Sequence, residues 1–294
     1  MNEHALPAER FEEDRAHLRA VAYRMLGSLS EAEDAVQDAW LRVSRADVAE
    51  VENITGWLTT VVARICLNML RSRQTRREEP LEERPSEPVA GEEGGADPER
   101  EALLADTVGV ALLVVLDTLT PAERLAFVLH DMFAVPFEEI ALMLERSPAA
   151  TRQLASRARR RVRGGAPAPG TDLKRRRRMV DAFLAATRGG DFEALVSLLH
   201  PDVVLRADAL VVPTPEAIVV RGAEPVARGA MAATGRARFT GIALLDGSVG
   251  LVMAPRGRLR LVLAFTITDE GITGIDVIAD PERLGGIELD VLGD

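Results

Sequence analysis

Apolar residues recur at helical spacing through the first 77 residues of the chain. One stripe begins at Phe11, a second runs from Ala32 to Val43, and a third, the longest, runs from Trp57 to Leu70. Thr55 stands just before the third stripe, where its side chain can cap the helix. A period of 3.6 residues predicts an all-α domain over residues 1–77.

A second helical block ends in two short helices separated by a three-residue break. Between Pro136 and Leu144 the apolar residues fall at the i, i+3, i+4 and i+7 positions that face a core. The next helix begins with Ser147 as its N-cap and Pro148 at its first position, where a missing N–H costs nothing. It continues arginine-rich to Arg163, and arginine neutralises phosphates and donates to guanine edges. This pattern predicts a DNA-binding helix-turn-helix within residues 101–165.

The pattern changes twice more along the chain. Residues 78–100 hold Glu, Pro and Gly with almost no large apolar residue, which predicts an acidic flexible linker. A Gly/Pro stretch predicts a hinge at 166–172. Two helices should follow, and then alternating or β-branched runs at 203–207, 217–222, 236–245, 250–254, 259–268 and 272–280. We therefore expect an α+β domain over residues 173–294 with a meandering antiparallel sheet.

Charge is strongly segregated along the 294 residues, although the net charge of −10 by itself argues against a general nucleic-acid binder. Residues 78–101 hold ten acidic side chains against two basic ones, whereas residues 146–178 hold twelve basic side chains against one acidic one. The basic surplus therefore surrounds the predicted helix-turn-helix. The run from Lys174 to Arg178 continues it, either as a DNA-contacting stripe or as the solvated face of a helix.

The cysteine and histidine content argues against several classes of protein. Cys66 is the single cysteine and lies in an apolar helical run, so we expect a buried thiol and no disulfide or redox pair. With four histidines besides, the sequence offers no metal-ligand spacing, and we expect no metal and no cofactor. No signal peptide opens the chain and no apolar stretch reaches the roughly 18 residues of a membrane span, so we expect a cytoplasmic protein without membrane contact.

Three segments together resemble the extracytoplasmic-function RNA polymerase sigma factors of the sigma-70 family. They are YRMLGSLSEAEDAVQDAWLRV at 23–43, WLTTVVARICLNMLRSR at 57–73, and LTPAERLAFVLHDMFAVPFEEIALML with ATRQLASRARRRV between 119 and 162. The last 120 or so residues resemble the SnoaL-like domain of one branch, most densely at SLLHPDVV and DVIADPERL. The resemblance implies a multidomain chain: two all-α sigma domains, called region 2 (1–77) and region 4 (101–165), and a C-terminal α+β SnoaL-like domain, cone-shaped and ketosteroid-isomerase-like (173–294).

The resemblance also implies partners and site residues. The partners are promoter DNA and core RNA polymerase, through its beta-prime clamp and beta flap. The helix from Glu31 to Val43 would dock on the clamp with Asp34, Gln37 and Asp38. In the melted minus-10 element, a flipped base would be held by Asn53, Thr55 and Trp57, and the backbone of the single strand by Arg64, Asn68, Arg71 and Arg73. The minus-35 element would be read by Ser147, Ala149, Thr151, Arg152, Gln153 and Ser156, with Arg157 and Arg160 on phosphates. Trp57 remains equally consistent with core packing, while Trp40 is expected in the core.

The C-terminal domain departs from the branch pattern. The linker has only EEPLEERPSEP and no tryptophan, and ADALVVPTPEA stands where the branch has a Gly-rich, lysine-containing turn. The closing turn reads Asp280-Pro281-Glu282-Arg283, the residues through which we expect the domain to regulate the sigma regions. The resemblance leaves open whether the C-terminal domain binds a small ligand.

Two other functions remain open from the sequence. One is a helix-turn-helix repressor with a ligand-sensing C-terminal domain. The other is an enzyme with a DNA-binding appendage, because SnoaL-like folds include isomerases that use a pocket carboxylate or histidine. His200, Asp202, Asp208 and Asp276 would be its candidate set. Spacing alone pairs none of these carboxylates with a histidine, so we expect an alternative sigma factor without catalysis of its own.

Overall fold

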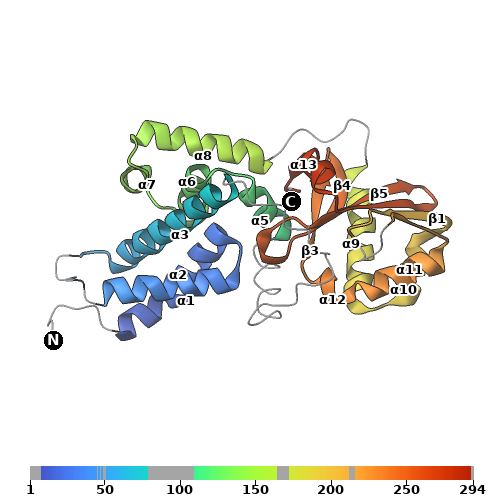
Figure 1. Ribbon diagram of the computed structural model, residues 1–294, viewed down its shortest axis with the longest axis horizontal. Coiled ribbons are helices and arrows are strands. Elements are labelled where there is room, and N and C mark those ends of the chain that lie inside the picture. The colour runs from blue at the N-terminus through green and yellow to red at the C-terminus, as the bar shows by residue number, and fades with distance from the viewer. Residues whose placement is uncertain are drawn as a thin grey trace. The chain divides into compact units, whose positions relative to one another are not determined.

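The computed structural model describes residues 8–44, 46, 48, 51–78, 109–163, 172–211 and 216–292, and these fall into two compact units (Figure 1). Unit 1 comprises residues 1–84 and 116–161, and unit 2 comprises residues 85–115 and 162–294. Unit 1 thus holds predicted region 2 together with most of predicted region 4. The predicted linker, and with it EEPLEERPSEP, lies outside the described residues, as does nearly all of the predicted hinge.

Three helices open unit 1: α1 (Ala8–Leu26), α2 (Leu29–Val43) and α3 (Ile54–Glu78). Their apolar stripes are buried against one another, with Leu18, Val36 and Leu58 fully enclosed. The three predicted helices are therefore confirmed. The predicted cap is wrong, however, because the Gly56 N–H donates to the side chain of Asn53 at 2.9 Å. Thr55 instead lies inside the first turn.

Further helices follow in this part of the chain. They are α5 (Val110–Asp117), α6 (Pro121–Phe127), which continues as the π turn η2 (Val128–Met132), α7 (Phe137–Leu144) and α8 (Pro148–Arg163). Glu145 adopts a left-handed conformation that ends α7. The Ala150 N–H donates to the Ser147 hydroxyl at 3.2 Å, so the predicted N-cap is present. The two predicted helices and the predicted N-cap at Ser147 are therefore confirmed.

Unit 2 is built on one sheet of order β2-β1-β6-β5-β4-β3-β7. Its strands are β1 (Leu199–Ala207), β2 (Ile218–Arg221), β3 (Thr240–Leu245), β4 (Ser248–Met253), β5 (Leu261–Thr268), β6 (Gly271–Ile278) and β7 (Leu289–Asp290). β3 to β6 form the predicted meander, but β1 pairs with β6 in parallel. The sheet is therefore mixed, and the expectation of a wholly antiparallel sheet was wrong.

Helices cover one face of this sheet: α9 (Leu173–Gly189), α10 (Phe192–Leu198), α11 (Ala223–Ala232) and the short α12 (Thr234–Ala237) (Figure 1). Phe183 of α9 packs edge-on against Phe265 of β5 within a core that also contains Leu195, Leu251 and Ile275. A one-turn 3-10 helix (Pro255–Gly257) and α13 (Pro281–Gly285) complete the unit. The strand predicted at 236–245 begins only at Thr240, because the alanine-rich segment before it is helical.

The first part of α5 belongs to unit 2, where it approaches β3 closely. A Cβ atom at Gly241 would lie 2.8 Å from the Cβ of Val110, a distance that no substituted residue tolerates. The glycine therefore permits this helix to lie directly on the strand. α5 is apolar on all sides, yet no helix in the described ranges is long and apolar enough to cross a membrane.

Candidate functional site

The outer face of α2 combines acidic, amide and apolar side chains. Asp34, Gln37 and Asp38 are all exposed, at the i, i+3 and i+4 positions that share one side of a helix. Leu41 follows one turn later and is 61% exposed. Sequence reasoning missed Leu41, although its position seven residues after Asp34 already placed it on this side. The face thus has an acidic part and an apolar part side by side.

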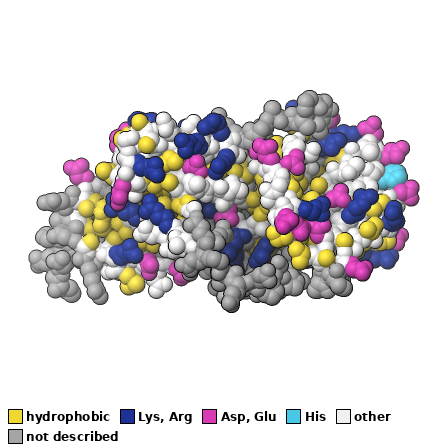
Figure 2. Space-filling model, turned by 45° about the horizontal axis from the view of Figure 1, so that its top comes forward, with side chains coloured by type: hydrophobic (Ala, Val, Ile, Leu, Met, Phe, Trp, Pro, Cys, Tyr) yellow, Lys and Arg dark blue, Asp and Glu magenta, His cyan; other side chains and the backbone are white. Residues whose placement is uncertain are grey.

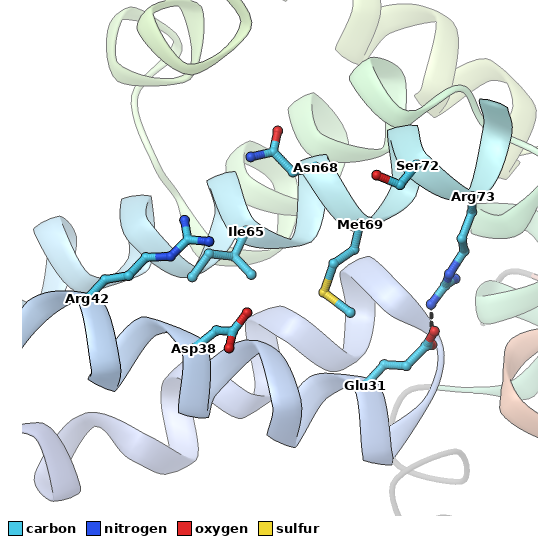
Figure 3. Close-up of a pocket in the computed structure, with 8 residues that line it drawn as sticks. All are labelled: Glu31, Asp38, Arg42, Ile65, Asn68, Met69, Ser72 and Arg73. Atoms are coloured by element: carbon cyan, nitrogen blue, oxygen red, sulfur yellow. Dashed lines mark ion pairs between the residues drawn. The ribbon is translucent and has the colours of Figure 1, made fainter. Parts of the chain in front are cut away.

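A cavity of about 260 Å³ lies between α2 and α3 (Figure 3). It is lined by Glu31, Asp38, Arg42, Ile65, Asn68, Met69, Ser72 and Arg73. The Arg73 guanidinium pairs with the Glu31 carboxylate at one end, as the dashed line in Figure 3 marks. The cavity therefore brings together Asp38 and Asn68, which the sequence assigned to two different partners.

The polar face of α3 divides into exposed and engaged residues. Arg64, Asn68 and Arg71 are exposed. The Arg73 side chain is only 14% exposed, because it pairs with Glu31 and donates to the Leu26 carbonyl oxygen at 3.3 Å. The prediction that Arg73 contacts the melted strand is therefore not supported, because its side chain holds α3 against the start of α2.

The start of α3 carries the other three residues predicted to melt the minus-10 element. Asn53 is exposed and caps the helix through its side-chain oxygen. The Thr55 hydroxyl donates to the Asp14 carboxylate of α1 at 3.0 Å. Trp57 is half-buried, which is consistent both with contact to the melted strand and with packing in the core. Asn53 and Thr55 thus have local structural roles at this helix start.

Most of the residues predicted to contact the minus-35 element lie on the exposed side of α8. Exposed are Ser147, Ala149, Arg152, Gln153, Ser156, Arg157 and Arg160. Thr151 is 0% exposed, and its hydroxyl donates to the Ser147 carbonyl oxygen at 3.1 Å. The prediction that Thr151 contacts a base is therefore not supported, because its side chain packs inward beside Ala155 and Ala158.

Two arginines of the same helix are engaged inside unit 1. The Arg159 Nε lies 2.6 Å from a carboxylate oxygen of Asp131 in η2. The Arg161 guanidinium lies 3.3 Å from the Glu123 carboxylate of α6, which also completes the cap of that helix. These pairs hold α8 to the preceding helices and leave the other side of α8 to present its cations. Figure 2 shows Lys and Arg side chains at several places on this face of the molecule, interspersed with Asp and Glu.

Comparison with known proteins places the chain in a family. The model of sigma-70 region 2 matches residues 11–76, and the model of sigma-70 region 4 matches residues 109–162. The chain is 38% identical over 95% of its length to the ECF RNA polymerase sigma factor SigJ of Mycobacterium tuberculosis, of which the match covers 93%. It belongs to the extracytoplasmic-function sigma factors. The predicted family is therefore confirmed.

A second relative spans both chains completely. The probable ECF RNA polymerase sigma factor SigI of Mycobacterium tuberculosis is 33% identical, and the match covers 100% of each chain. Among solved structures, the crystal structure of Mycobacterium tuberculosis SigJ is 34% identical, with coverage of 95% and 99% and a TM-score of 0.43. As a sigma factor the chain is a transcription initiation factor that works with core RNA polymerase and promoter DNA, and it is not an enzyme. The two alternative functions, a helix-turn-helix repressor and an enzyme with a DNA-binding appendage, are therefore wrong.

Region 2 and region 4 of this sigma factor pack together within unit 1. Phe133, which follows η2, meets the His17 ring edge-on at 5.4 Å between centroids, and the Arg24 guanidinium lies 5.3 Å from its centroid. Arg124 of α6 is 2% exposed and donates from Nε to the Arg24 carbonyl oxygen at 3.3 Å. Its other partner is Asp117 at 3.5 Å. A groove of about 230 Å³ beside Arg124 is lined by α3 and by residues 117–121.

Burial perturbs three titrating groups near this contact, and one of them is Arg24, whose guanidinium pKa is lowered by desolvation. Burial lowers the pKa of Arg124 to about 10, because the desolvated guanidinium is less stable in its charged form and Asp117 only partly compensates. It raises the pKa of the Cys66 thiol to about 12, because the thiolate would be fully buried. The expectation of a buried thiol is therefore confirmed, and this thiol is unsuited to redox sensing.

The predicted regulatory turn of the C-terminal domain is a capped helix start. Asp280 accepts from the Arg283 N–H at 3.0 Å, and Pro281 and Glu282 occupy the first turn of α13. Asp208, at the end of β1, accepts the Ala279 and Asp280 N–H groups at 3.0 and 3.1 Å and pairs with the Arg283 guanidinium. This single carboxylate ties the turn to β1.

The four candidate catalytic residues of the C-terminal domain do not form a set. His200 pairs with Glu270 at 3.3 Å and accepts the Asp202 N–H at 3.1 Å. Asp208 holds the turn at 280–283 through the contacts described above. Asp276 alternates along β6 with Ile275 and Val277, which face the helices, and it lies 3.8 Å from Arg206 on the neighbouring strand. In the part of the chain that the structure describes, no group of three or more His, Cys, Asp or Glu side chains could hold a metal ion.

The basic run at the start of α9 has structural partners. Arg175 lies 2.6 Å from the Asp269 carboxylate and donates to the Thr268 carbonyl oxygen at 2.8 Å. Arg177 lies 3.9 Å from Asp181, one turn further along the helix. These contacts favour the solvated helix face over a DNA-contacting stripe.

Proposed function

We propose that this sigma factor docks on the beta-prime clamp of core RNA polymerase through the outer face of α2 and contacts the beta flap through region 4. The observation that carries the proposal is the exposed set of Asp34, Gln37 and Asp38 beside Leu41 on one side of a helix whose other side is buried. Carboxylates favour a basic partner and steer its approach, whereas an exposed leucine at their edge supplies apolar area that a complex can bury.

For DNA, we propose a division between two helices. Region 2 holds the melted minus-10 strand with Arg64, Asn68 and Arg71, helped by Asn53 and Trp57 at the start of α3. Region 4 reads the minus-35 element in the major groove. The supporting observation is that these α3 side chains and the predicted α8 side chains, apart from Thr151, are exposed or half-buried. Arg157 and Arg160 of α8 contact phosphates.

The domain bounds predicted from the sequence remain part of this proposal: region 2 at 1–77, the linker at 78–100, region 4 at 101–165, the hinge at 166–172 and the SnoaL-like domain at 173–294. The C-terminal domain modulates the two sigma regions through the turn at residues 280–283, with a small ligand as a further input. A factor that binds core polymerase works where the polymerase is, so we also propose a cytoplasmic location.

Binding to purified core polymerase tests the docking face. Asp34→Ala/Asp38→Ala should weaken core binding and run-off transcription at least about tenfold, with the larger effect at low salt because charge steering is screened. Glu9→Ala/Glu52→Ala removes two exposed carboxylates elsewhere in region 2 and is the matched control. Equal activity of the two double variants would contradict the proposed docking face.

Asp208→Asn in the full chain tests the regulatory turn. The Asp208 carboxylate pairs with Arg283 and accepts two backbone N–H groups of the turn. A neutral amide forms no ion pair with Arg283 and is a weaker acceptor, so the substitution loosens the turn at 280–283. We expect altered run-off transcription from a fixed promoter with unchanged binding to core polymerase. Unchanged transcription, with the turn shown to be loosened by amide exchange, would remove the regulatory part of the proposal.

A further inference from the structure

One arginine on the exposed side of α8 differs from its neighbours in how it is held. Arg152 lies in the second turn of the helix, and its Nη2 is 2.8 Å from a carboxylate oxygen of Glu138 in α7. Its guanidinium carbon lies 5.5 Å from the centroid of the Phe137 ring. Arg152 is thus contacted by both of the first two residues of α7.

The orientation of the Phe137 ring is itself fixed by a neighbouring ring. It stacks on the His130 ring with centroids 3.7 Å apart and 25° between the planes. The His130 Nδ1 lies 3.0 Å from the Val135 carbonyl oxygen, which sets the orientation of that imidazole. A layered arrangement of imidazole, benzene ring and guanidinium therefore runs from η2 through α7 to α8.

This arrangement orders a side chain that stays accessible. The side chains of Arg152 and Glu138 are 53% and 63% exposed, so neither is buried by the pairing. A free arginine loses substantial rotamer freedom when it binds, and a planar guanidinium must lie in the plane of a guanine to donate to its O6 and N7 atoms. Ordering before binding removes much of that cost.

We propose that Glu138 and Phe137 are positioning residues that hold the Arg152 guanidinium for bidentate recognition of one guanine in the minus-35 element. The inference rests on the proposed function of α8 as the reader of that element. Glu138 accepts one of five N–H groups, so the remaining donors suffice for two hydrogen bonds to a base.

The same carboxylate makes Arg152 a poor general phosphate binder. Its negative charge 2.8 Å from Nη2 offsets the attraction of the guanidinium for the DNA backbone. Hydrogen bonds to a base edge depend on the direction of the donors, and the pair with Glu138 fixes the direction of the Arg152 guanidinium. Arg152 therefore contributes to sequence preference and little to binding of DNA in general.

The test uses the full chain with core polymerase and selects bound promoters from a pool with a randomised minus-35 element. Arg152→Ala should reduce the preference for guanine at one position roughly tenfold. Glu138→Ala should reduce the preference at that same position several-fold and leave the other positions and the affinity for random DNA undiminished. Glu138→Gln, which keeps an acceptor oxygen, should restore most of the preference, and Phe137→Leu should lower it.

Glu139→Ala is the matched control, because it removes the neighbouring exposed carboxylate of the same helix. If Arg152→Ala relaxes one position and Glu138→Ala does not, the positioning inference is wrong while the proposed function stands. If Arg152→Ala changes no position, its proposed base contact fails first. If Glu138→Ala weakens all sequences equally, Glu138 has only a structural role.

Discussion

The buried guanidinium of Arg124 offers a quantitative test of how regions 2 and 4 are held together. Burial lowers its pKa from 12.5 to about 10, and at about 1.4 kcal/mol for each pH unit the charged form costs roughly 3 kcal/mol in the folded state. This cost already includes the attraction of Asp117, whose carboxylate lies 3.5 Å away. The hydrogen bond to the Arg24 carbonyl oxygen is long, at 3.3 Å, and offsets at most about 1 kcal/mol more.

Arg124→Met keeps most of the side-chain volume and removes the charge. We expect the free energy of unfolding of unit 1 to rise by about 1–2 kcal/mol, in line with the replacement of other buried ion pairs by apolar side chains. Asp117 loses its partner at little cost, because its side chain stays 27% exposed and water can solvate it. Arg124→Ala should instead be about 2–5 kcal/mol less stable than Arg124→Met, since it leaves a cavity.

Urea unfolding followed by tryptophan fluorescence measures this quantity for unit 1 alone, because both tryptophans of the chain, Trp40 and Trp57, lie in region 2. The unfolded guanidinium titrates near 12.5 and the folded one near 10, so the penalty is complete below pH 10 and is relieved only above it. The gain from Arg124→Met should therefore be equal at pH 6 and pH 8. A loss of more than about 1 kcal/mol would refute the reasoning and show that the two contacts outweigh desolvation.

Four further outcomes follow from the geometry. Leu41→Glu should weaken binding to core polymerase without lowering the unfolding midpoint, because this leucine is exposed. Thr151→Val should leave promoter selection unchanged, whereas Gln153→Ala should relax it at one position by about 1–3 kcal/mol, as footprinting on variant promoters would measure. The Cys66 thiol, with its pKa raised to about 12, should resist alkylation at pH 8 until the protein unfolds. Asp208→Asn should speed amide exchange at Ala279 and Asp280, and unchanged exchange would contradict its clamping role.

The helix-turn-helix could be predicted from sequence because its determinants are local. The N-cap Ser147 and the following Pro148 act over one turn, and α8 begins where they place it. The parallel pairing of β1 with β6 could not be predicted in this way, since it joins strands about 70 residues apart. Nothing within either strand signals its partner, and a hairpin pattern accounts only for strands that neighbour each other in sequence.

The roles of the arginines depend still more on tertiary contacts. In sequence, Arg152, Arg157 and Arg159 are equivalent members of one basic helix. The fold places Asp131 beside Arg159, where the carboxylate covers a guanidinium that the helix already turns inward. It places Glu138 beside Arg152, where the carboxylate orders a guanidinium that remains exposed. An acidic neighbour can therefore either remove an arginine from the DNA-binding surface or prepare it for a base, and only the direction of the side chain relative to the helix core decides which. Arginine density predicts that a helix binds DNA, but identification of the residues that read a base requires the positions of the acids around them.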